Sequence, residues 1–185
     1  ATVVDVTIGL DVDNRPLVQV ADNGYGMGLE DLENAMRYGA DQKAEQRRLG
    51  WFGLGLKTAS TSFCRQLTVV SRPRGSESVY SAMWDLDDVV EANDWVLDIG
   101  DAMGENEDAY FEYVDVLSKD EKGLSSGTVV LWRKVDRLLQ KPKGGDYVNP
   151  KAALDRRIDS LVWHLRMGYQ RYLDRDDKRA TNVEI

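Results

Sequence analysis

Apolar and polar residues alternate at the start of the chain. Val4, Val6 and Ile8 are separated by single residues, and after a turn-like segment at 11–16 the apolar pattern resumes and runs to Val20. Alternation with a period of two is typical of strands that bury one face. The first twenty residues therefore predict a β-hairpin.

Two glycine-rich segments each precede a short helical pattern. Residues 22–28 contain too much glycine for a strand interior, and 29–38 place apolar side chains on one helical face. The second cluster, at 50–57, leads into small residues that suit a buried helix. Further strands are predicted at 66–71, 78–84 and 127–132, and a long amphipathic helix is predicted after a Pro- and Gly-containing linker, through to about Tyr172.

Charge is unevenly distributed along the 185 residues, which carry a net charge of −8. Between Asp85 and Lys122 there are 14 acidic residues and 2 lysines, a local balance of −12, so the remainder carries +4. An acidic insertion is thus set into a mildly basic body. A charge run is usually a solvated face, so this pattern neither establishes nor excludes a phosphate-bearing ligand.

Several functional classes are excluded by composition. Cys64 is the single cysteine and His164 the single histidine, so an internal disulfide, a zinc or iron–sulfur site and a His-dependent triad cannot be assembled. No apolar run approaches the ~18–20 residues that a membrane span needs, and no targeting leader opens the sequence. We therefore expect a cytoplasmic chain without membrane partners.

The two glycine clusters, separated by a cationic segment, suit a polyphosphate. Glycine lets the backbone approach closely, and free N–H groups at a helix start attract anions. Taken alone, the same clusters are also compatible with ordinary structural turns. A Walker A loop fits poorly because Leu56 stands where its last glycine should precede Lys57, and a dinucleotide fingerprint fits poorly because Gly28 comes one residue early and a hairpin precedes it.

Four motifs occur in an order that resembles the GHKL superfamily, which groups gyrase B, the ninety-kilodalton heat-shock chaperones, histidine kinases and MutL. They are Asp-Asn-Gly-Tyr-Gly-Met at 22–27, a lid-like Arg-Tyr-Gly-Ala-Asp-Gln-Lys at 37–43, Leu-Gly-Trp-Phe-Gly-Leu-Gly-Leu-Lys at 49–57, and Gly-Thr at 127–128. The joint match of order, spacing and context is far more specific than any one motif. Within the superfamily the lid and the second glycine motif look most similar to the MORC-like and chaperone-like branches.

The resemblance implies a role for individual residues. Asp22 would accept a hydrogen bond from the adenine amino group, Met27 would pack beside the base, and Thr128 would join Asp22 at the adenine edge. Backbone groups near the ribose and phosphates would come from Gly24, Gly26, Gly53, Leu54, Gly55 and Leu56, and the side chains of Lys43 and Lys57 are candidate phosphate contacts.

The resemblance also implies the fold and the domain organisation. The expected class is α+β, a two-layer α/β sandwich of the Bergerat type, with a mixed, mostly antiparallel sheet and helices on one face. Residues 1–140 would form the ATP-binding domain, with the acidic insertion at about 85–122. Residues 141–185 would hold a linker, the C-terminal helix and the start of a transducer-like domain.

The implied function is binding of ATP or ADP with Mg²⁺ to drive a conformational switch, with ATP-dependent self-association in the full-length protein and a protein or DNA client. The family's catalytic glutamate and magnesium-binding asparagine lie on a helix that would precede Ala1, so we expect this segment to bind nucleotide and to hydrolyse it negligibly. Two alternatives stay open: a non-catalytic nucleotide-sensing module that recruits a partner through the acidic insertion, and the catalytic domain of a sensor histidine kinase.

Overall fold

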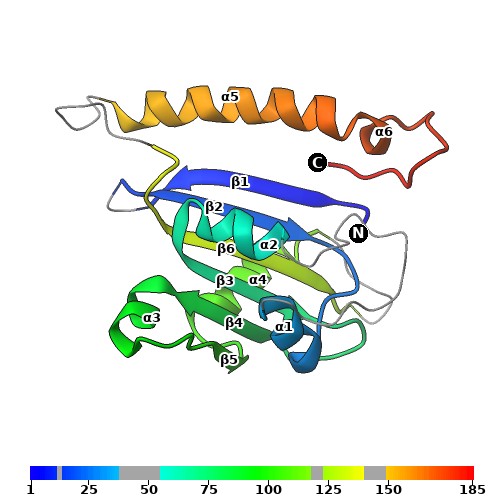
Figure 1. The fold of residues 1–185 in the computed structure, drawn as a ribbon. Coiled ribbons are helices and arrows are strands. Elements are labelled where there is room, and N and C mark those ends of the chain that lie inside the picture. The colour runs from blue at the N-terminus through cyan, green and yellow to red at the C-terminus, as the bar shows by residue number, and fades with distance from the viewer. Residues whose placement is uncertain (12–13, 38–54, 118–122, 140–148) are drawn as a thin grey trace.

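The computed structural model describes residues 1–11, 14–37, 55–117, 123–139 and 149–185, and these form a six-stranded sheet with helices against it (Figure 1). The predicted hairpin is confirmed: β1 (Val4–Leu10) pairs antiparallel with β2 (Pro16–Asp22), and Val6 lies opposite Val20. The hairpin forms one edge of the sheet and carries the first glycine motif at its end.

The strand order is β1-β2-β6-β3-β4-β5, and every pair in the described sheet is antiparallel. The remaining strands are β3 (Cys64–Arg72), β4 (Tyr80–Asp85), β5 (Asp98–Asp101) and β6 (Gly127–Val135). The three strands predicted after the second glycine cluster are thus present, and β5 is additional. Strand β6, the last strand in the sequence, lies between β2 and β3. It therefore connects the N-terminal hairpin to the strands β3, β4 and β5.

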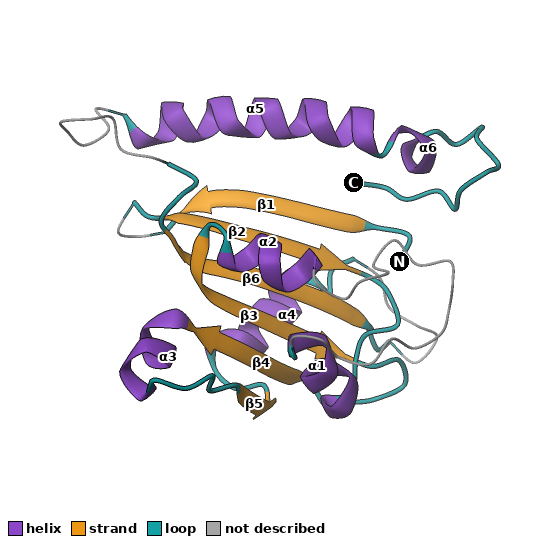
Figure 2. Ribbon diagram, in the orientation of Figure 1, coloured by secondary structure: helices purple, strands orange, loops and turns teal. Residues whose placement is uncertain are grey.

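Helices α1 (Leu29–Met36) and α2 (Gly55–Thr61) cover one face of the sheet (Figure 2). Leu32 and Met36 of α1 are fully buried, and they pack in one cluster with Leu67 and Val69 of β3. These two helices are the ones that the glycine-rich segments predict. The apolar stripe of α1 supplies the hydrophobic contact that holds the first glycine turn against the sheet, and α2 adds Leu56 to the same cluster.

Helix α4 (Glu105–Tyr113) packs on the opposite face, which corrects the expectation of helices on one face only. Tyr110 is fully buried there, in a cluster with Val70 of β3 and Val129 of β6. Val69 and Val70 are both fully buried although they point to opposite faces, so the sheet centre is covered on both sides. The α+β class with an antiparallel sheet is confirmed. Helix α4, which lies within the acidic run and was not predicted, adds a third layer.

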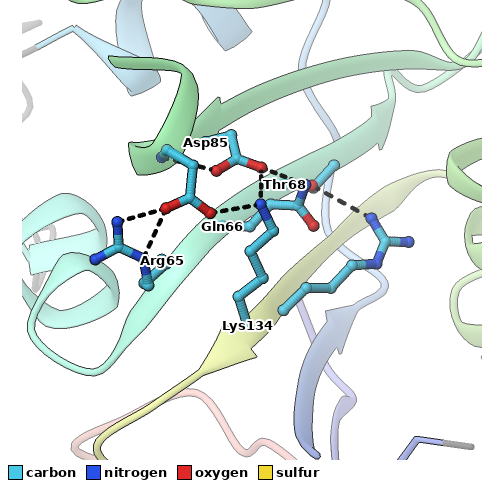
Figure 3. A network of polar contacts seen from close by, with 7 residues as sticks. Arg65, Gln66, Thr68, Asp85 and Lys134 are labelled. Carbon is cyan, nitrogen blue, oxygen red and sulfur yellow. Dashed lines mark hydrogen bonds and ion pairs between the residues drawn. The ribbon is translucent and has the colours of Figure 1, made fainter. Parts of the chain in front are cut away.

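Helix α3 (Leu86–Ala92) is fixed to the sheet by a charged network at its N-terminus (Figure 3). The buried Asp85 accepts a hydrogen bond from the Asp87 backbone N–H at 3.0 Å and one from Gln66 Nε2 at 3.0 Å. Lys134 Nζ lies 2.7 Å from Asp85 and 2.8 Å from Asp87, which Arg65 also contacts. Part of the acidic insertion's charge is therefore neutralised locally by cations from β3 and β6.

Helix α5 (Pro150–Gly168) confirms the predicted C-terminal helix and runs beside β1 (Figure 1). Asn149 caps it by accepting a hydrogen bond from the Ala152 N–H at 3.0 Å. The short α6 (Gln170–Leu173) follows, and the chain returns to make one parallel bridge between Glu184 and Val3. Among the helices of the described ranges, none has the length and apolarity that crossing a membrane requires.

Cys64 is a direct probe of the packing between α1 and the sheet, because it lies in the same buried cluster as Leu32 and Met36. Its side chain is 2% exposed, and burial raises the pKa of the thiol from 9.0 to about 12, with Asp136 adding to the shift. Because the thiolate is the reactive form, we expect the folded chain to resist iodoacetamide at pH 8 and the urea-unfolded chain to react with one equivalent. The unfolded thiol ionises first, so folding stability falls as the pH rises from about 9 towards 12. Mass spectrometry after timed labelling measures the rate at which iodoacetamide modifies Cys64. Rapid labelling of the folded protein would contradict the burial of this side chain.

Candidate functional site

A row of three polar residues crosses the centre of the sheet on the face that α1 and α2 cover. Asp22 at the end of β2 lies opposite Thr128 of β6, and Thr128 lies opposite Ser71 of β3. Residues directly opposite one another on neighbouring strands point to the same face. The two residues that the sequence assigns to the adenine edge, 106 positions apart, are thereby brought together (128 − 22 = 106).

Asp22 is held in a fixed orientation by the glycine turn that follows it. The Gly24 N–H donates to Asp22 Oδ1 at 2.7 Å, and within the described ranges no residue donates to the other carboxylate oxygen. Burial raises the pKa of Asp22 above its usual 3.8, and the Gly24 hydrogen bond and the N-terminal ammonium oppose this shift. The result is a half-buried acceptor with one oxygen available to a ligand.

Thr128 is almost fully buried and is tied to β3 through Ser71. The two hydroxyl oxygens lie 2.8 Å apart, and Ser71 Oγ also lies 2.9 Å from the carbonyl oxygen of Gly127. Ser71 belongs to no motif and was not among the predicted site residues. The signal for it in the sequence is a serine at the end of the apolar run of β3, where a buried hydroxyl needs a partner.

The first glycine turn is packed directly against the end of β3. Gly26 has φ 65°, and a Cβ placed there would lie 1.9 Å from the carbonyl oxygen of Arg72. The next residue, Met27, donates its N–H to Ser71 Oγ at 2.8 Å, and Ser126 Oγ donates to the carbonyl of Gly24 at 2.8 Å. A glycine is required at position 26 for this close approach.

The second glycine motif lies only partly within the described structure. Two of its predicted contact residues, Gly53 and Leu54, lie outside the described residues, as does Lys43 of the lid-like motif. Gly55 begins α2, a Cβ there would meet nothing within 4 Å, and Leu56 packs against the α1 cluster. Phosphate contact by this motif stays a prediction.

Lys57 has partners that its motif does not indicate. Its side chain is 1% exposed, and Nζ donates to the carbonyl oxygens of Ala35, at 3.1 Å, and Arg37. Burial lowers the pKa of this ammonium. Those carbonyls end α1, so Lys57 links the start of α2 to the point where the chain leaves α1 for the lid-like segment. Contact between Lys57 and phosphate stays a prediction.

The arrangement can receive a group that donates hydrogen bonds, such as an amino group on a flat ring. A fixed carboxylate oxygen and a hydroxyl share one face of the sheet. Within the described ranges no three His, Cys, Asp or Glu side chains are grouped to hold a metal ion. Magnesium binding therefore stays a prediction. Asp22 and Thr128 are placed to contact an organic group of a ligand.

The comparison of sequences shows that this is an ATPase-type domain and gives its family. The model of the family described as histidine kinase-, DNA gyrase B-, and HSP90-like ATPase matches residues 1–123, so the chain belongs to that family. The predicted superfamily is thus confirmed, while similarity to its MORC-like and chaperone-like branches stays a prediction. No curated protein matches the sequence.

Among solved structures, the chain is similar to the Aquifex aeolicus MutL ATPase domain complexed with ADP. The two share 16% sequence identity with a TM-score of 0.46, and the match covers 91% of this chain and 49% of that one. The chain therefore spans about half the length of this structural neighbour.

Proposed function

We propose that this chain binds an adenine nucleotide, ATP or ADP, with the base against Asp22 and Thr128. The observation that carries the proposal is the half-buried carboxylate of Asp22, which the Gly24 N–H orients and which keeps one oxygen available on the α1 and α2 face of the sheet. Adenine presents an amino group at its 6-position and guanine presents a carbonyl. A fixed acceptor therefore distinguishes adenine from guanine. The guanine carbonyl would face the Asp22 carboxylate, and two acceptors left without a donor cost about 1–3 kcal/mol of binding free energy.

The purpose that we propose for binding is a switch. Nucleotide binding would drive a conformational change, and the link between Lys57 and the end of α1 connects the two helices that follow the glycine motifs. We also propose magnesium-dependent hydrolysis and self-association for the full-length protein, and membership of an ATPase family supports this part of the proposal. A ligand drives such a change only by its difference in affinity for the two states.

The test is calorimetric titration with ADP, a non-hydrolysable ATP analogue and GDP in magnesium buffer. We expect adenine nucleotides to bind and Asp22→Asn to lower their affinity at least tenfold. The substitution replaces a charged acceptor by a neutral amide, and a hydrogen bond to a charged group contributes about 1.5–3 kcal/mol. Asp159→Asn, on the exposed side of α5, is the matched control and should bind as the parent chain does.

Two results would contradict the proposal in different ways. A folded parent chain that binds neither ADP nor the ATP analogue would refute adenine nucleotide binding by these residues. Equal affinities for the parent chain and Asp22→Asn would leave binding intact and remove Asp22 from it. Circular dichroism on each sample establishes that the comparison is between folded proteins.

A further inference from the structure

Ser71 occupies the centre of the polar contacts beneath the proposed adenine site. Its side chain is fully buried, and its Oγ has three partners: the Met27 N–H at 2.8 Å, the Gly127 carbonyl at 2.9 Å and the Thr128 hydroxyl at 2.8 Å. These partners come from the first glycine turn and from β6, which lies between β2 and β3 (Figure 1). One buried hydroxyl therefore joins both halves of the site.

The direction of each hydrogen bond follows from counting protons. A serine hydroxyl has one proton to donate and two lone pairs to accept with. The Met27 N–H can only donate and the Gly127 carbonyl can only accept, so Ser71 uses one lone pair for Met27 and its single proton for Gly127. What is left is one lone pair, and Thr128 must donate its proton to it.

We infer that Ser71 is a positioning residue for base specificity, because it takes up the proton of Thr128 and leaves the Thr128 oxygen as an acceptor. The inference rests on the proposed adenine site and assigns its selectivity to a residue outside the motifs. Asp22 and Thr128 then present acceptors only. Such an edge favours the 6-amino group of adenine and disfavours the 6-carbonyl of hypoxanthine or guanine, which offers another acceptor.

The experiment compares ADP with inosine diphosphate, whose hypoxanthine carries a 6-carbonyl and N1–H and lacks the 2-amino group of guanine. We expect the parent chain to prefer ADP by at least tenfold. In Ser71→Ala the Thr128 proton is released and can be donated to the 6-carbonyl, so the ADP preference should fall about tenfold, with tighter binding of inosine diphosphate than in the parent chain. Ser81→Ala, the same change on the neighbouring β4, should keep the parent preference.

The ratio of the two affinities separates this role from a structural one. Removing the Ser71 hydroxyl also takes a partner from the Met27 N–H, which would weaken both ligands equally and leave their ratio unchanged. A ratio in Ser71→Ala within twofold of the parent value would overturn the inference, even where both affinities fall.

A second variant and a second observation keep the test decisive. Ser71→Cys preserves the side-chain volume if the alanine variant does not fold, and because a thiol donates and accepts weakly, its ADP preference should also fall below that of the parent. An unchanged preference in that variant would equally overturn the inference. The proposed function fails separately, in the parent chain itself, if no ADP binding is observed there.

Discussion

Gly127→Ala is expected to lower the free energy of unfolding by about 3–5 kcal/mol, a large part of the roughly 5–15 kcal/mol that is usual for a domain. Gly127 has φ 148°, and a Cβ there would lie 2.0 Å from the carbonyl oxygen of Asp22 and 2.9 Å from a methyl carbon of Val114. The nearest atom is backbone of the central strand pair, so it cannot move aside as a flexible side chain would. Urea unfolding followed by tryptophan fluorescence measures the change.

Two other glycines separate the contributions to this effect. Gly75 has φ 78° with nothing within 4 Å of an added Cβ, so Gly75→Ala carries conformational strain alone, about 1–2 kcal/mol. Gly100 lies in β5 with open space beside it and no positive φ, and Gly100→Ala should be close to neutral. Similar losses for Gly127→Ala and Gly75→Ala would contradict the argument from overlap with Asp22.

Arg72→Ala should lower the free energy of unfolding by about 3 kcal/mol, because it removes a buried cation from a hydrogen-bonded network. The Arg72 side chain is 5% exposed; its guanidinium lies 3.3 Å from Asp115, donates to the Ser125 carbonyl at 2.9 Å and sits 4.8 Å from the centroid of the Tyr110 ring. These contacts attach α4 and the segment before β6 to the end of β3. The same unfolding titration reports the loss.

Arg65→Ala is the control for that substitution. Arg65 also pairs with an aspartate, Asp87, but the two side chains are 41% and 49% exposed. Exposed ion pairs contribute less than about 1 kcal/mol because water and salt screen them. Equal destabilisation by the two alanine variants would show that burial of Arg72 adds nothing, and the account of α4 attachment given above would be wrong.

The sequence predicts local elements of this protein well because each has its own pattern. Alternation at Val4, Val6 and Ile8 indicates the first strand, and the glycines around Met27 indicate a turn leading into a helix. The proximity of Asp22 and Thr128 was also predicted, since each stands in a recognisable motif. These features depend on neighbours in the sequence, or on a family's motif order.

Contacts between distant segments were not predicted where no motif marks both partners, because no local pattern encodes them. Ser71 meets Thr128 only because β6 enters beside β3, and Lys57 meets the end of α1 only once both helices lie on the sheet. Helix α4 was missed for another reason. Its buried Ala109 and Tyr110 stand among acidic residues, so the apolar positions are too few for a clear helical period.

The position of β6 determines when the sheet can form during synthesis. Until residues 127–135 have left the ribosome, the inner edges of β2 and β3 have no strand between them, and both expose unpaired backbone groups that can associate with other chains. Strand pairings between segments this distant in sequence also form slowly. The entropy of closing a long loop is lost before the strand contacts can stabilise the pair. A nucleotide held between Asp22 and Thr128 could therefore stabilise only chains whose synthesis has passed β6, and nascent chains must reach that length without its help.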